Sequence, residues 1–186
     1  MMSFNPDMIT YAVSLHFSPD VNEIITSTAK LISEATGNNF IIENKIPPHV
    51  TIGAFHAVKD DEAKLINMVE DFSKNQKGGF IQFKEIGNFN EKVLFLKPEK
   101  DSFLSQINEA LHTAFLAEFE KAENGYYMPE IWYPHTTLAT KLNNRQFENA
   151  LKIAQNIKLP LVSEISEIAV YQSSPFIELK RFPLMH

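Results

Sequence analysis

One six-residue pattern occurs twice in this chain and constrains its fold more than any other feature. Residues 48–53 (Pro-His-Val-Thr-Ile-Gly) and residues 134–139 (Pro-His-Thr-Thr-Leu-Ala) both read Pro-His-x-Thr-aliphatic-small, and 86 positions separate the two histidines. With six His and ten Pro in 186 residues, the expected number of Pro-His-x-Thr matches is on the order of 0.02. The repeat therefore indicates two comparable halves that carry the same local structure.

Each copy of the pattern fits a short extended strand. Side chains two positions apart in a strand point to the same face, so His49 lies beside Thr51, and His135 lies beside Thr137. Each copy therefore presents an imidazole next to a hydroxyl. If a pseudo-twofold axis relates the two halves, both pairs converge on one cleft.

The hydrophobic pattern along the rest of the chain predicts alternating strands and helices. Strands are expected at 11–17, 39–46, 50–55, 80–86, 92–97, 131–140, 164–173 and 176–182, and helices at 19–36, 60–74, 101–120 and 145–156. This order favours an α+β fold with mostly antiparallel pairing over a parallel, doubly wound sheet. No stretch reads as a flexible linker, so we expect residues 1–186 to form a single bilobal domain.

Composition narrows the possible partners. Apolar residues make up 44% and charged residues 22%, which is typical of a soluble protein with a packed core. Seventeen Lys and Arg face twenty-three Asp and Glu, and the net charge of −6 argues against long duplex nucleic acid as a partner. There is no cysteine, and no apolar stretch near the N-terminus reaches the roughly 20 residues that cross a bilayer. We expect a cytoplasmic protein that avoids membranes, with a monomer favoured.

Two imidazole–hydroxyl pairs suit phosphoester chemistry without a metal. A neutral imidazole takes a proton from the attacking oxygen, and a protonated one gives a proton to the departing oxygen. Histidine is the side chain whose ordinary pKa, about 6.5, permits both roles near neutral pH. The hydroxyls donate to the non-bridging oxygens as charge builds on phosphorus. Neither copy of the motif contains Asp or Glu, so we expect neither a metal nor another cofactor.

The chain resembles the two-histidine phosphoesterase superfamily, which includes RNA 2′,3′-cyclic phosphodiesterases and the 2′,5′ RNA ligases, and which is defined by two His-x-Thr/Ser-x motifs. The resemblance covers nearly the whole chain, because the expected elements follow the family's order. Residues 169–173 (Ala-Val-Tyr-Gln-Ser), followed by 182–184 (Phe-Pro-Leu), are similar to the usual C-terminal pattern of the family.

The resemblance implies a bilobal α+β fold, with two pseudo-symmetric lobes of mostly antiparallel sheet, helices outside and a central cleft. It places the catalytic roles on His49, Thr51, His135 and Thr137. It also implies a substrate among cyclic phosphates of RNA ends, 2′,5′-linked oligonucleotides and small cyclic nucleotides. The function it implies is that of a phosphodiesterase. The alternative from another class is a module that binds a phosphorylated nucleotide or an RNA end without turning it over.

Five further residues are candidates for substrate binding, each with a structural alternative. His16 shares a strand face with Ser14 and lines the cleft if it is not simply an exposed strand residue. Tyr171 contacts either the ligand or the core. Trp132 and Tyr133 stack on a base if they do not belong to the core. Lys141 falls on the face of His135 by strand parity and meets phosphate if it is not a solvated lysine.

Overall fold

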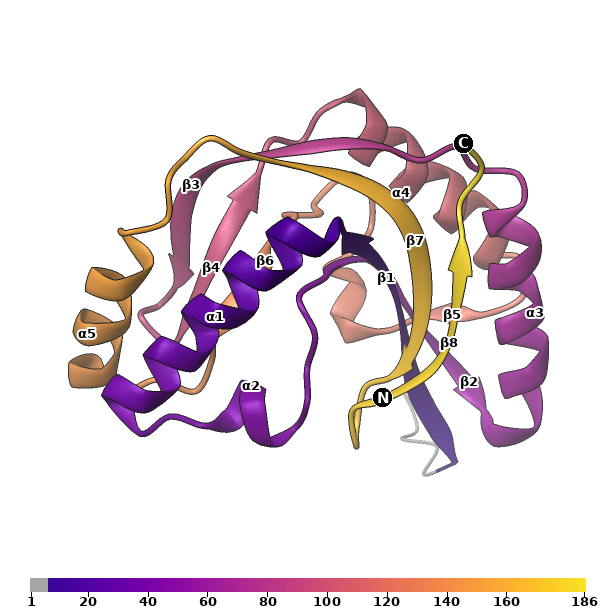
Figure 1. The fold of residues 1–186 in the computed structure, drawn as a ribbon. Helices are drawn as coiled ribbons and strands as arrows, with labels where there is room; N and C mark the ends of the chain where they lie inside the picture. The colour runs from indigo at the N-terminus through magenta and orange to yellow at the C-terminus, as the bar shows by residue number, and fades with distance from the viewer. Residues whose placement is uncertain (1–6) are drawn as a thin grey trace.

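The computed structural model of the protein describes residues 7–186, which form an α+β fold built on one antiparallel sheet (Figure 1). The strands are β1 (Met8–Phe17), β2 (Val50–Val58), β3 (Gly79–Phe89), β4 (Val93–Pro98), β5 (Glu120–Lys121), β6 (Thr136–Ala139), β7 (Leu161–Gln172) and β8 (Ile177–Pro183). The helices are α1 (Pro19–Thr36), α2 (Phe40–Glu43), α3 (Glu62–Ser73), α4 (Ser102–Phe115) and α5 (Asn144–Ala154), with short 3-10 helices η1 (Lys59–Asp61) and η2 (Glu123–Gly125). The predicted fold class is confirmed.

Strand β7 joins two halves of the sheet, whose order is β5-β2-β1-β7-β3-β4-β6. Its first part, from Leu161 to Ile165, pairs with β3. Its second part, from Ile165 to Gln172, pairs with β1, and β8 also pairs with this second part. One lobe therefore contains β5, β2, β1 and β8, and the other contains β3, β4 and β6, while the long curved β7 belongs to both (Figure 1).

The helices cross between the lobes. Helix α1 follows β1 in the chain but packs on β6 and α5, and α4 follows β4 but packs on β2 (Figure 1). The buried face of α1 has the helical spacing seen in the sequence, with Val21, Ile25 and Ile32 fully buried. Its ends also follow the sequence, because Pro19 occupies the first turn and Gly37 ends the helix with a left-handed φ of 70°. Each lobe is thus covered by a helix from the other half.

Three predicted elements differ from the structure. The strand expected at 39–46 is wrong, since this segment contains the one-turn helix α2 and pairs with no strand in residues 7–186. Its apolar residues are consecutive, and such a run does not distinguish a strand from a helix. The helix expected to reach residue 120 ends at Phe115. The strand expected at 131–140 is limited to Thr136–Ala139, because the chain before it forms turns.

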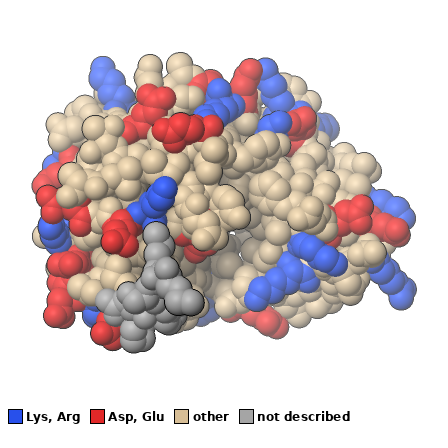
Figure 2. Space-filling model, turned by 180° about the vertical axis from the view of Figure 1, so that it is seen from behind, with Lys and Arg blue, Asp and Glu red and all other residues tan. Residues whose placement is uncertain are grey.

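None of the helices in residues 7–186 combines the length and the apolar character needed to cross a membrane. The charged side chains are mixed rather than segregated on the face shown in Figure 2, where Lys and Arg alternate with Asp and Glu and uncharged residues fill much of the middle. This face carries no continuous basic stripe, in line with the net charge of −6.

Asn108 on α4 connects the two halves through its side chain. It is fully buried, and its Nδ2 donates to the carbonyl of Ile52 at 2.8 Å and to the carbonyl of Tyr127 at 2.9 Å. The first carbonyl belongs to β2, just after the first motif threonine. The second belongs to the segment that leads into the second motif. One amide group therefore pairs a buried carbonyl and a partly buried one that come from different parts of the chain.

We expect Asn108→Ala to lower the free energy of unfolding by about 1–3 kcal/mol, because it leaves the buried carbonyl of Ile52 and the partly buried carbonyl of Tyr127 without this donor. The measurement is urea unfolding, in which the midpoint falls while the slope stays constant. Asn156→Ala is the matched control, since the exposed Asn156 amide also donates to two carbonyls, those of Lys152 and Ile153. A similar loss in both variants would contradict the connecting role of Asn108.

Candidate active site

The two motif histidines are held in the same way. Nδ1 of His49 lies 2.7 Å from the carbonyl oxygen of Pro47, and Nδ1 of His135 lies 2.9 Å from the carbonyl oxygen of Tyr133. In each case the carbonyl belongs to the residue two positions earlier. Because a carbonyl only accepts hydrogen bonds, Nδ1 carries the proton, and Nε2 is left to accept or donate one. The repeated sequence thus gives a repeated side-chain geometry.

Both imidazoles have a lowered pKa. Burial is the main cause for each, and the hydrogen bond to the backbone carbonyl opposes it by favouring the charged form. A positive charge on His135 lowers the pKa of His49 further. The two rings therefore lie close enough that a proton on one disfavours a proton on the other.

The motif threonines lie within strands β2 and β6, whereas each motif histidine lies just before its strand begins. Thr51 and Thr137 are half-buried, whereas Thr136, one position earlier in the second copy, is fully buried. Thr51 pairs with Ser14 of β1, and their hydroxyl oxygens lie 3.2 Å apart. Ser14 is a contact of the site that the sequence did not single out, although its parity with His16 was visible.

Trp132 does not have the role proposed for it as a base-stacking residue. Only 4% of the residue is exposed, and its indole Nε1 donates to the carbonyl of Thr51 at 3.1 Å. A buried ring offers no free face to a base, so that interpretation is wrong. Trp132 instead ties the segment three residues before His135 to the backbone of the first motif.

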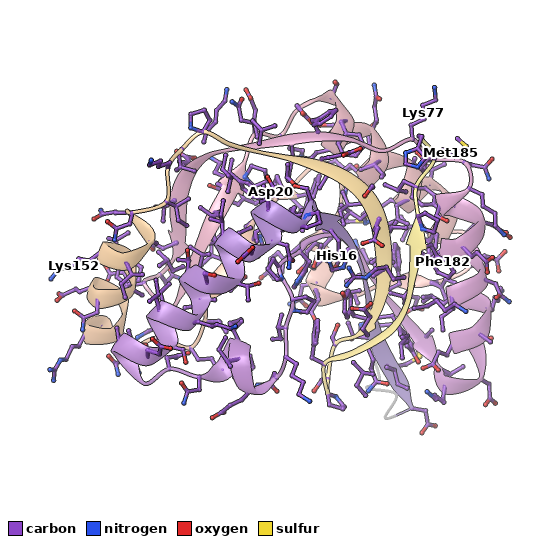
Figure 3. The ribbon with its side chains drawn as sticks, viewed as in Figure 1. His16, Asp20, Lys77, Lys152, Phe182 and Met185 are labelled. Carbon is purple, nitrogen blue, oxygen red and sulfur yellow. The ribbon has the colours of Figure 1, made fainter. Side chains whose placement is uncertain are left out.

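His16 is buried, with 2% exposed, so the alternative of an exposed strand histidine is wrong. Its strand lies inside the sheet between β2 and β7, and in Figure 3 it lies near the middle of the molecule, away from Phe182. Its Nε2 is 2.8 Å from the hydroxyl of Tyr171. Burial, followed by the positive charges of Arg181 and His49, lowers the pKa of His16 to about 3.

Tyr171 links His16 to a charged pair on β8 that the sequence did not reveal. Its hydroxyl donates to Glu178 at 2.8 Å, and Glu178 forms an ion pair of 2.9 Å with Arg181. The ring centroid of His49 lies 6.5 Å from that of His16 and 6.0 Å from that of Tyr171. The side of His49 is therefore packed with ordered polar and aromatic groups. Tyr171 itself is fully buried and takes part in the core as well as in this cluster.

The last two candidates lie near the second motif. Tyr133 is 43% exposed, with its ring centroid 5.8 Å from that of Phe89. Lys141 lies beyond the end of β6 and has a left-handed φ of 57°, so the parity argument that placed it on the face of His135 does not apply. Its ammonium lies 4.0 Å from the ring centroid of Phe40.

Residues 7–186 contain no cluster of three or more His, Cys, Asp or Glu that could hold a metal ion.

Comparisons with known proteins agree with this geometry. Residues 26–174 match the family model of the 2′-5′ RNA ligase superfamily. A protein of Bacillus cytotoxicus that is named as a phosphoesterase is 26% identical over 109 residues, which cover 57% of this chain and 59% of that protein. The match thus spans less than two thirds of the length of this relative.

The fold is similar to that of two solved bacterial structures. LigT of E. coli, complexed with 3′-AMP, has a TM-score of 0.63 at 16% identity, with 96% of this chain and 99% of that chain covered. A protein of Thermus thermophilus named TT0787 has a TM-score of 0.64 at 14% identity, with 95% and 98% covered. The family match over most of the chain, together with the two equivalent His-x-Thr sites, shows that this chain belongs to the 2′-5′ RNA ligase superfamily of two-histidine phosphoesterases.

Proposed function

We propose that the protein is a phosphodiesterase that hydrolyses a 2′,3′-cyclic phosphate or a 2′,5′ phosphodiester without a metal. The observation that carries the proposal is the pair of equivalent imidazoles, each with Nδ1 bonded to a backbone carbonyl and Nε2 left for chemistry. A site that only binds phosphate has no need of two such groups. Family membership supports a phosphoesterase activity in general.

The reaction balances with the chain's own residues and one water molecule. One neutral imidazole accepts a proton from the water, and the water oxygen forms a bond to phosphorus. The bond between phosphorus and the ester oxygen breaks, and this oxygen takes a proton from the second imidazole, which is protonated at the start. The product is a phosphomonoester, and the two imidazoles have exchanged protonation states.

The hydroxyls of Thr51 and Thr137 have a supporting role in this scheme. Each follows its histidine by two residues, and in our proposal it donates to a non-bridging phosphate oxygen as negative charge increases. Ser14 accompanies Thr51 at 3.2 Å and limits the directions in which the Thr51 hydroxyl points. The threonines thus bind charge, and the histidines move protons.

A small nucleotide or an RNA end is the substrate class that we propose. Among the similar structures, those of E. coli LigT hold 3′-AMP, ATP and NADP+, all of which are small nucleotides. The net charge of −6 and the mixed charges in Figure 2 favour a short ligand over a long polyanion.

Replacing either histidine separates an enzyme from a binding module. We expect His49→Ala and His135→Ala each to lower kcat by about 10²–10⁴-fold with little change in ligand affinity, because each group moves a proton in the transition state. Thr51→Val and Thr137→Val are expected to cost about 10- to 100-fold, through one lost hydrogen bond to a charged oxygen. Hydrolysis and binding are measured on the same variants with a panel of cyclic and 2′,5′-linked nucleotides.

The controls are His56→Ala and Thr113→Val, because His56 bonds to Thr10 and Thr113 bonds to its own helix. Both are expected to keep parental activity. Weakened affinity with no turnover in the parent protein would favour the binding module, and full activity of both motif alanine variants would contradict the catalytic assignment.

The pH dependence of kcat/KM is expected to be bell-shaped, because one imidazole must be neutral while the other is protonated. Burial lowers the pKa of both His49 and His135 below 6.5, so protonation of the base, which inactivates, occurs at lower pH than for a free histidine. Loss of the proton from the acid also occurs at lower pH. The maximum therefore lies on the acid side of pH 6.5, and rates are measured from about pH 4 to 9 with and without EDTA. A maximum above about pH 7.5, or a loss in EDTA that a divalent ion restores, would contradict the proposal.

Trp132→Phe tests the link between the two motifs. The variant keeps the buried ring but removes the N–H that donates to the Thr51 carbonyl. We expect kcat to fall by about 10-fold from misplacement of the catalytic groups, with KM nearly unchanged. Phe103→Leu, a replacement of a partly buried ring elsewhere in the core, is the control. Equal kcat values for Trp132→Phe and the parent protein would show that this bond does not set the geometry.

A further inference from the structure

His112 lies on α4, away from both motifs, and the fold uses only one of its two ring nitrogens. Only 3% of the residue is exposed. Its Nδ1 lies 2.8 Å from the carbonyl oxygen of Asn108, one helical turn earlier. Because a carbonyl only accepts hydrogen bonds, Nδ1 carries the proton and Nε2 of the neutral ring is an acceptor. Nε2 makes no hydrogen bond to any group in residues 7–186.

The surroundings of the ring direct Nε2 toward a cavity. The ring packs against Phe55 of β2, with the centroids 5.5 Å apart, and Nδ1 faces its own helix. A cavity of about 540 Å³ lies next to the ring, and His112 is part of its lining. Burial is the main cause that lowers the pKa of His112, so the ring is neutral near pH 7. A buried imidazole therefore presents an unpaired acceptor to an open space.

The other polar side chains that line this cavity also offer only acceptors. They are the exposed carboxylates of Glu109 and Glu130 and the hydroxyl of Thr113. Neither carboxylate forms an ion pair within the described part of the chain. The Thr113 hydroxyl donates its proton to the carbonyl of Glu109 at 2.9 Å, so its lone pairs remain. No described Lys or Arg lines the cavity, and its ligand must supply both donors and positive charge.

An organic ammonium group meets this requirement better than a metal ion does. An aliphatic ammonium has three N–H donors and no acceptor. The absence of a metal-binding cluster in residues 7–186 means that the two carboxylates and the imidazole do not converge on one ion. Separate acceptors favour positive groups spaced along a chain. Leu116 and Met128 line the same cavity, where they offer apolar contact to the methylene groups of such a chain.

We propose that this cavity is a binding site for an aliphatic diamine or polyamine. One ammonium group donates to Nε2 of His112, and the carboxylates of Glu109 and Glu130 balance the positive charges. The proposal does not rest on the proposed function, because no residue of either motif lines this cavity.

The first experiment is calorimetric titration with 1,4-diaminobutane, n-butylamine and 1,4-butanediol in about 0.15 M salt, which screens non-specific attraction. We expect saturable binding of the diamine, binding of the monoamine that is weaker by at least about 3-fold, and no binding of the uncharged diol. His112→Phe, which keeps a buried ring but removes Nε2, is expected to weaken binding of the diamine by about 10-fold.

Glu130→Gln changes an exposed residue and is expected to weaken diamine binding by about 2- to 5-fold, as for the loss of one exposed ion pair. Glu148→Gln on α5 is the matched control, because Glu148 is also exposed and forms no ion pair within residues 7–186. This variant is expected to bind the diamine like the parent protein. Equal weakening in both glutamine variants would show general attraction to an acidic protein and would overturn the site.

The second experiment uses the parent protein alone and so does not depend on how a variant folds. The ¹⁵N resonance of Nε2 in His112 is followed by NMR as 1,4-diaminobutane is added. We expect this resonance to move as Nε2 accepts a hydrogen bond, while that of Nε2 in His56, which lies on β2, stays in place. An unchanged His112 resonance at saturation, or no saturable binding below about 10 mM diamine, would overturn the proposal.

Discussion

The arrangement of this site depends on two hydrogen bonds from side chains to consecutive carbonyls of one strand. β2 carries the first motif, and its pairing with the short β5 involves only Phe55 and His56. On the β1 side the register shifts between Thr51 and Gly53, and the carbonyls of Thr51 and Ile52 accept from the indole of Trp132 and the amide of Asn108. Trp132 comes three residues before His135, so the backbone of the first motif is bonded directly to the segment that carries the second. Carbonyls inside the fold are costly to leave unpaired, so these two bonds hold the two motif segments together.

The larger architecture supports the same junction. β7 pairs with strands of both lobes, and α1 and α4 each pack on the lobe to which they do not belong in sequence order. Movement of one lobe relative to the other would break apart buried helix–sheet contacts as well as the two hydrogen bonds. A pair of groups that exchanges protons across a phosphate requires such fixed positions, because small errors in distance reduce the rate steeply.

The periodicity of apolar residues predicted most of the helices and strands. Features that depend on contacts between distant parts of the chain were not predicted. Strand parity predicted His49 beside Thr51 and His135 beside Thr137, but each histidine lies one residue before its strand begins, so this placement stays a prediction. The same rule failed for Lys141, where the strand has already ended. The apolar run at 40–42 formed a helix rather than a strand. Trp132 has an aromatic ring of the kind that stacks on bases. Only its hydrogen bond to the carbonyl of Thr51, 81 positions away, shows its structural role. The cluster of Tyr171, Glu178 and Arg181 was equally invisible, because it depends on how β8 pairs with β7.

The repeated motif supplies equivalent chemistry, and the unrepeated surroundings make the two copies different. His49 lies against Tyr171 and Phe176, whereas His135 borders an open cavity. A positive charge on His135 lowers the pKa of His49, so the pair disfavours double protonation and takes up its protons in two steps. Two copies of one motif thus have different surroundings because the packing around each histidine differs.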